Sequence, residues 1–183
     1  MGDEGDRVLV VEDDADLREV YRRILSEFYD TATAATGTEA VEAMSDDTDV
    51  VLLDRRLPDT DAETLVRELQ NRYRDCYIAL VTGVEPGFDI IELGIDDYLV
   101  KPVTTEQLHD TVERLLSLAE YDAIYRQLSQ KRVKRNVLAE EKSPEELGQS
   151  DEFDRLQTDI DRLETELDDV AETVDETIRG LEQ

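Results

Sequence analysis

The sequence predicts an α/β fold in which buried parallel strands alternate with helices. Short apolar runs rich in β-branched residues recur along the chain, and they are typical of strands buried on both faces. Segments with helical periodicity separate these runs, and that alternation favours a parallel sheet. The strand runs are residues 8–11, 50–53, 78–81 and 98–100, and the helical segments are residues 15–28, 37–45 and 62–73.

Capping-box pairs mark the expected starts of several helices. In this motif a Ser or Thr side chain and a Glu or Gln three residues later satisfy the free amides of the first turn. The pairs are Thr36 with Glu39, Thr60 with Glu63, Thr104 with Gln107, and Ser143 with Glu146.

Polar residues stand where the strand runs stop. Glu12 and Asp13 follow the first run and Asp54 follows the second, while Thr82 and Lys101 follow the third and fourth. In open α/β sheets, ligands bind beyond the carboxyl ends of the strands. We therefore expect these side chains to meet in one crevice.

The chemistry of this crevice follows from its groups. Three crowded carboxylates, Glu12, Asp13 and Asp54, raise each other's pKa values unless a cation lies among them, and a site made only of oxygen atoms suits Mg²⁺. Asp54 is then placed as a nucleophile towards phosphorus, while Lys101 and Thr82 offer a charge and a hydroxyl to phosphoryl oxygens. The alternative is that each acid is an ordinary solvated loop residue. Their joint placement at successive strand ends argues against it.

These motifs resemble the receiver domain of two-component response regulators, over about residues 5–118. The matching stretches are Val-Val-Glu-Asp-Asp, Leu-Leu-Asp-Arg-Arg-Leu-Pro-Asp, Val-Thr-Gly and Asp-Asp-Tyr-Leu-Val-Lys-Pro. The resemblance implies a flavodoxin-like parallel sheet of five strands in the order 2-1-3-4-5.

The same resemblance implies roles for individual residues. Asp54 is the expected phosphoacceptor, Thr82 and Lys101 contact the phosphoryl group, and Tyr98 moves inward when Thr82 does. The Lys101–Pro102 peptide bond is expected to be cis, as it usually is in this family. The expected ligands of Mg²⁺ are Glu12, Asp13, Asp54 and the backbone carbonyl of Arg56.

The segment between Thr82 and Lys101 departs from the family pattern. It is about three residues shorter than in most receivers, and residues 84–88 contain both Pro and Gly. We therefore expect the fourth helix of the receiver to be short, shifted or partly irregular. That helix normally belongs to the signalling face, so the usual route of the signal is in doubt.

The composition is strongly acidic. The 183 residues carry a formal net charge of −28, and 39% of them are hydrophobic, enough to fill a core. Acidic residues are spread over most of the chain and Arg outnumbers Lys, which favours adaptation to a cytoplasm rich in salt, where charges are screened within a few ångströms. The alternative is a chain that avoids or mimics nucleic acid, for which we expect clustered acids.

Compartment and cysteine use are consistent with an intracellular protein. No apolar stretch is long enough to span a membrane and no secretion signal precedes the first strand, so we expect a cytoplasmic protein. Cys76 is the single cysteine, and we expect it to serve packing.

The rest of the chain is predicted to be helical. Residues 104–142 contain neither Gly nor Pro, so one helix is expected to run through them, and Gly148 and Ser150 mark a turn before a last helix. That helix carries a coiled-coil pattern of apolar residues spaced three and four apart. The pattern consists of Phe153, Leu156, Ile160, Leu163, Leu167, Val170, Val174, Thr177 and Leu181.

Three arrangements of this last helix stay open. It forms a solvated amphipathic helix, a parallel homodimer, or an antiparallel hairpin with the preceding helix. In the dimer, Asp159 faces Glu164 of the second chain and like charges oppose pairing. In the hairpin, the acidic helix lies against the basic cluster of residues 126–135, and this is the arrangement we prefer. The stretch is similar to the HalX domain of halophilic archaea, which gives expected domains at residues 5–118 and 119–183.

The preferred function is a response regulator that accepts a phosphoryl group from a sensor histidine kinase. Its helical output domain then alters binding to itself, to a second copy or to a downstream protein. The alternative is a transcription regulator that binds DNA through the basic segment near Lys131 and Arg135, although we find no DNA-reading motif. A separate output enzyme is not expected, because residues 119–183 contain no His and no Cys. The sequence identifies neither the kinase and its stimulus nor the target.

Overall fold

A computed structural model describes residues 5–180, with side chains described as far as residue 176. It divides into two compact units, which meet in sequence between Leu116 and Ser117. Each unit is described separately below.

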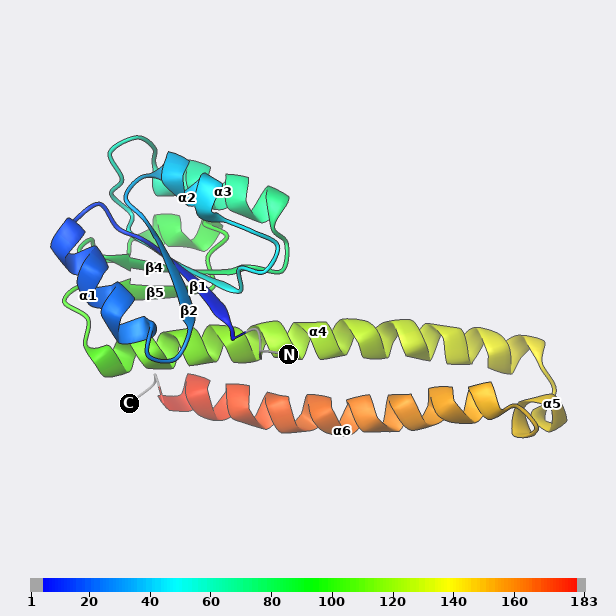
Figure 1. Cartoon of the computed structure of the whole chain (residues 1–183). Coiled ribbons are helices and arrows are strands. Elements are labelled where there is room, and N and C mark those ends of the chain that lie inside the picture. The colour runs from blue at the N-terminus through cyan, green and yellow to red at the C-terminus, as the bar shows by residue number, and fades with distance from the viewer. Residues whose placement is uncertain (1–4, 181–183) are drawn as a thin grey trace. The chain divides into compact units, whose positions relative to one another are not determined.

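The first unit contains a five-stranded parallel sheet in the order β2-β1-β3-β4-β5, as expected. Its helices lie on both faces of the sheet (Figure 1). The strands are β1 (Arg7–Val11), β2 (Asp30–Ala34), β3 (Val50–Leu53), β4 (Tyr77–Thr82) and β5 (Asp97–Val100). The helical elements are α1 (Ala15–Leu25), α2 (Gly37–Ala43), α3 (Ala62–Arg72), the 3₁₀ segment η1 (Phe88–Glu92) and the first turns of α4 (Thr105–Glu141).

Alternate residues of the central strands supply the two halves of the core, because successive side chains of a strand point to opposite faces. Leu9, Val51 and Leu53 pack in one buried cluster with residues of α2 and α3 such as Ala40 and Leu65. On the other face Figure 1 places α1 and the start of α4, which contribute buried residues of their own. These are Tyr21, Leu25, Leu108, Val112 and Leu115.

Three details of the unit differ from the sequence predictions. The cap of α3 is Asp61, whose carboxylate accepts from the amide of Thr64 at 2.8 Å, so the predicted Thr60–Glu63 box is wrong. Strand β2 was not marked by an apolar run, because Thr and Ala alternate in it. Strand β5 is not buried on both faces: it is an edge strand, and Val100 is 41% exposed.

The shortened segment before β5 behaves as predicted. In place of a regular helix it forms only the five-residue 3₁₀ segment η1, which follows Pro86 and Gly87. The Lys101–Pro102 peptide bond is cis, also as predicted.

The second unit is a helical hairpin. The long helix α4 continues without a break to Glu141, and the short α5 (Pro144–Gly148) leads to α6 (Asp151–Gly180). Helix α5 begins with the predicted capping box of Ser143 and Glu146. Figure 1 shows α6 returning antiparallel to the second part of α4. Among the described residues, no helix combines the length and apolar character needed to cross a bilayer.

Candidate functional site

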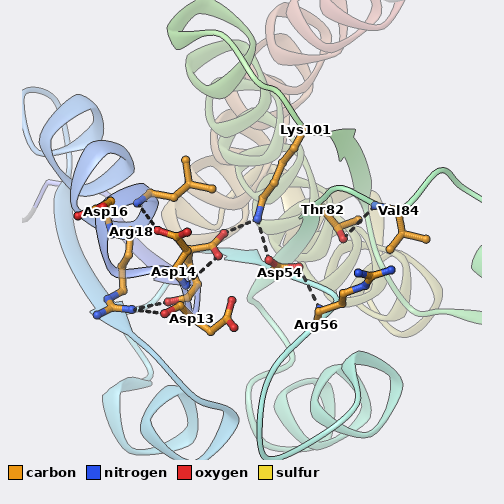
Figure 2. Close-up of polar contacts among 11 residues, drawn as sticks. Asp13, Asp14, Asp16, Arg18, Asp54, Arg56, Thr82, Val84 and Lys101 are labelled. Carbon is orange, nitrogen blue, oxygen red and sulfur yellow. Dashed lines mark hydrogen bonds and ion pairs between the residues drawn. The ribbon is translucent and has the colours of Figure 1, made fainter.

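The carboxyl ends of four strands bring the predicted polar residues to one edge of the sheet. Glu12 directly follows β1, Asp54 follows β3, Thr82 ends β4, and Lys101 follows β5. Register holds these ends together, because the amide of Asp54 donates to the carbonyl of Val11 at 2.9 Å. Figure 2 shows Asp54, Thr82 and Lys101 facing a common space.

Lys101 bridges two carboxylates in this space. Its ammonium nitrogen Nζ lies 2.5 Å from Glu12 Oε2 and 2.7 Å from Asp54 Oδ2 (Figure 2). Glu12 is 2% exposed and Asp54 7% exposed. Charges this deeply buried require partners, because leaving them unpaired costs several kcal/mol.

Burial and pairing act against each other on these groups. Burial raises the pKa of Glu12, and the neighbouring charge of Asp54 adds to the rise, while the hydrogen bond from Lys101 opposes it. Burial by itself lowers the pKa of Lys101, but its hydrogen bonds to Asp54 and Glu12 outweigh this, and the pKa is raised. Lys101 is therefore a fixed positive charge beside Asp54.

The loop between β1 and α1 is held by two further residues. Asp14 caps α1, with its Oδ1 accepting from the amides of Asp16 and Leu17 at 3.0 Å. Arg18 donates to the carbonyl oxygens of Glu12 at 2.6 Å and of Asp13 at 3.3 Å (Figure 2). Sequence reasoning missed Arg18, because nothing in the sequence separates it from an ordinary surface arginine.

Three carboxylates can hold a cation here. Oxygen atoms of Glu12, Asp13 and Asp54 all lie within 4.8 Å of one another, and Asp13 is exposed to solvent. Carboxylate oxygens with an open side for water are the donor set that Mg²⁺ prefers. The backbone amide of Arg56 donates to Asp54 Oδ1 at 2.9 Å. The role of the Arg56 carbonyl stays a prediction.

Thr82 and Tyr98 lie beside this group on β4 and β5. Thr82 is fully buried, and its Oγ1 accepts from the amide of Val84 at 3.4 Å. The amide of Lys101 donates to the carbonyl of Thr82 at 2.9 Å. The hydroxyl of Tyr98 donates to the carbonyl of Val84 at 2.6 Å, so it is engaged by the chain that follows β4.

The predicted apolar stripe of α6 faces α4 within the second unit. Ile160 and Leu163 are buried together with Ile124 and Leu128 of α4, while Leu156, Leu167 and Val170 are partly buried against this cluster. Phe153 and Val174 are also partly buried. The side chain of Thr177 and residue Leu181 lie outside the described residues.

Two ion pairs join the same helices. Lys131 Nζ lies 2.6 Å from Asp159 Oδ2, and Arg132 Nη2 lies 2.7 Å from Glu164 Oε1. The acidic α6 thus lies against the basic part of α4, as the preferred hairpin predicts.

Comparison with protein families assigns both parts of the chain. Residues 8–113 match the response regulator receiver domain, and residues 117–182 match the HalX domain. A protein of the haloarchaeon Haloferax volcanii is 43% identical over 117 residues, which are 63% of this chain and 20% of that protein. The transcriptional regulatory protein CitT of Halalkalibacterium halodurans is 31% identical over 133 residues, or 68% of this chain and 58% of CitT. The chain thus spans less than two thirds of the length of these two relatives.

Solved structures similar to this chain include receiver domains and response regulators. A CheY-like receiver domain protein of Methanospirillum hungatei superposes with a TM-score of 0.60 at 25% identity, covering 64% of this chain and 98% of that one. The response regulator TrrA of Thermotoga maritima, solved in complex with Mg²⁺ and BeF, gives a TM-score of 0.54 at 29% identity. The match covers 60% of this chain and 98% of the TrrA chain. By its matched residues and its fold, this chain belongs to the response regulator receiver domain family.

Proposed function

We propose that the protein is a phosphorylation-switched response regulator in which Asp54 accepts the phosphoryl group. The observation that carries the proposal is the bridge from Lys101 to Asp54 and Glu12 at the ends of three strands. The phosphoryl donor in this proposal is a sensor histidine kinase. Residues 5–118 form the phosphoacceptor domain and residues 119–183 the output domain.

The reaction is a transfer to a carboxylate oxygen. An oxygen of Asp54 forms a bond to phosphorus, and the phosphorus–nitrogen bond of a phosphohistidine breaks, with its electron pair leaving on the imidazole. Lys101 stabilises the negative charge on the phosphoryl oxygens. The Thr82 hydroxyl supplies a second contact to the phosphoryl oxygens. Without the phosphoryl group, its oxygen accepts a hydrogen bond from the Val84 amide.

Glu12, Asp13 and Asp54 would hold Mg²⁺, with the carbonyl of Arg56 as a further ligand. The ion supplies charge neutralisation, which lets an anionic phosphoryl group approach three carboxylates. The TrrA structure with Mg²⁺ and BeF supports this assignment by analogy.

The helical hairpin is the output element of this proposal, with the stripe from Phe153 to Val174 as its packing seam. Phosphorylation alters how the hairpin packs on itself, on a second copy or on a downstream protein. We do not favour DNA binding, because Lys131 and Arg132 of the basic segment are already paired with Asp159 and Glu164. This pairing leaves less positive charge for a phosphate backbone. We expect no separate output enzyme.

Mass spectrometry of the intact protein tests the proposal. After incubation with acetyl phosphate and Mg²⁺, the wild type is expected to gain one phosphoryl group and Asp54→Asn none. Asp59→Asn is the matched control, since Asp59 lies on the same loop but its carboxylate accepts from the amides of Gly37 and Thr38 at the start of α2. Equal labelling of the wild type and Asp54→Asn contradicts the assignment.

A further inference from the structure

The 3₁₀ segment η1 is held by few buried side chains. None of its five residues is buried, and Phe88 and Ile91 are 92% and 77% exposed. These two residues are three apart and therefore project from the same face of a 3₁₀ helix. The segment has no side-chain cap at its start, and its terminal backbone hydrogen bonds are 3.3 and 3.2 Å long. Its position therefore depends on the packing of Leu93, directly after it, against the core and on polar contacts with neighbouring elements.

Arg55, the residue directly after Asp54, makes such a contact. Its guanidinium donates a hydrogen bond to the carboxylate of Asp89 in η1. Tyr98 and Asp89 beside this guanidinium raise the pKa of Arg55. Tyr98 in turn donates to the carbonyl of Val84. One ion pair thus joins the loop after β3 to η1.

The ion pair between Arg55 and Asp89 is weak enough for a new anion to compete with it. Asp89 carries one negative charge and its side chain is 51% exposed, so solvent and salt weaken the pair. A phosphoryl group on Asp54 adds about −1.5 to −2 charge one residue from Arg55. Its oxygen atoms match the fork of a guanidinium, which binds phosphate through two parallel hydrogen bonds.

We propose that Arg55 is a positioning residue that ties η1 to the phosphoacceptor loop and releases it when Asp54 is phosphorylated. The inference rests on the proposed function of Asp54. The phosphoryl group takes the guanidinium from Asp89, so that η1 loses this ion pair to the phosphoacceptor loop. The exposed face of Phe88 and Ile91 then moves as a consequence of phosphorylation.

Hydrogen exchange of residues 84–93 in the full chain tests this inference, with beryllofluoride and Mg²⁺ as the phosphoryl mimic. In the wild type we expect the mimic to speed exchange by about two- to fivefold, the range that an exposed ion pair supports. Arg55→Gln and Asp89→Asn should exchange faster without the mimic and respond little to it. Arg55→Lys should restore part of the slow exchange. Arg67→Gln is the matched control, because its pair with Glu63 lies within α3.

The charge-reversed double variant Arg55→Asp with Asp89→Arg separates switching from simple support. It restores an ion pair, so basal exchange should return to the wild-type rate. The residue beside Asp54 is then an acid, which a phosphoryl mimic does not attract, and the response should be lost. A wild-type response in this variant overturns the inference, as does unchanged basal exchange in both single variants.

Acetyl phosphate labelling of the same samples distinguishes this inference from the proposed function. If Asp54 takes up a phosphoryl group while the exchange rate of residues 84–93 is the same with and without the mimic, the proposed positioning role of Arg55 is wrong and the proposed function stands. If the wild type takes up none, both are wrong.

Discussion

Lys101 and Asp54 are 47 residues apart in sequence, yet Lys101 Nζ lies 2.7 Å from Asp54 Oδ2. The same nitrogen lies 2.5 Å from Glu12 Oε2, so one cation compensates two buried carboxylates. On the buried side of the site Lys101 is thus hydrogen-bonded to both carboxylates, while Asp13 lies at the exposed edge.

Lys101→Ala should destabilise the first unit in the absence of Mg²⁺. Removing the cation leaves Glu12 and Asp54 buried and facing each other, which costs on the order of 3 kcal/mol. Urea unfolding with EDTA measures the loss, and saturating Mg²⁺ should restore much of it. Arg67→Ala, which breaks an exposed pair on α3, should change little. An equal loss in both variants contradicts the special role of Lys101.

Asp13→Ala should weaken Mg²⁺ binding strongly and leave the fold intact. Asp13 is exposed and removing it relieves repulsion with Glu12 and Asp54, so no buried charge loses its partner. Calorimetric titration with MgCl₂ measures the affinity, and labelling by acetyl phosphate should fall in parallel. Asp47→Ala is the control for the general loss of one surface acid. Normal labelling of Asp13→Ala excludes Asp13 as a ligand.

Ile160→Ala should loosen the helical hairpin. Ile160 is 1% exposed and packs against α4 in the cluster with Ile124 and Leu128, so its truncation costs about 2–5 kcal/mol. Loss of helicity on urea titration measures the change, with exposed Thr165→Ala as control. Labelling of Asp54 should persist.

A variant with polar residues at both Ile160 and Leu167 separates the hairpin from a dimer. If a second copy covers this seam, the mass in solution should halve in the variant. A hairpin monomer should lose helicity at unchanged mass. If neither mass nor helicity changes, the stripe is not a packing seam.

The pair of Lys131 and Asp159 should stabilise the hairpin more in dilute salt than in concentrated salt. Its hydrogen bond lowers the pKa of Asp159, but both side chains are partly exposed. A double-mutant cycle with Lys131→Met and Asp159→Asn should give a weak favourable coupling at low ionic strength and a smaller one in molar KCl. Coupling that persists undiminished at high salt argues for a buried pair.

Titration of the buried Cys76 thiol should make the first unit less stable at alkaline pH. Burial raises the pKa of the Cys76 thiol to about 12, whereas a cysteine thiol in an unfolded chain has a pKa of about 8.5. The folded state favours the neutral thiol. The contribution of Cys76 to the free energy of unfolding is therefore complete below the pKa of the unfolded state, and it is lost as the pH rises towards the pKa of the folded state. By pH 10 the loss is about 2 kcal/mol. Urea unfolding of the wild type should show it relative to Cys76→Ala, whereas parallel pH profiles contradict it.

The fold could be predicted from the sequence because most of its strands are short apolar runs that alternate regularly with helical segments. The runs that became β1, β3, β4 and β5 are each followed by a polar residue, and parallel strands bring those ends together. This is why Glu12, Asp54, Thr82 and Lys101 were found from the sequence. Strand β2 was missed because its Thr and Ala residues carry little apolar signal.

Local competition between neighbouring groups was harder to predict. Both Thr60 and Asp61 are good capping residues, and only the path of the chain into α3 gives the role to Asp61. Arg18 lies on a helix surface, where arginine is common, and its bond to the carbonyl of Glu12 depends on how the β1–α1 loop folds back.

By itself the sequence determined which residues end the apolar strands, where most of the helices start, and that α6 carries an apolar stripe, because these features depend on spacing along the chain. Tertiary structure decided the partners of charged side chains. The contacts from Lys101 to Glu12, from Arg55 to Asp89 and from Lys131 to Asp159 join residues 89, 34 and 28 positions apart. Such contacts depend on the packing of whole elements, which brings together charges that no local pattern pairs.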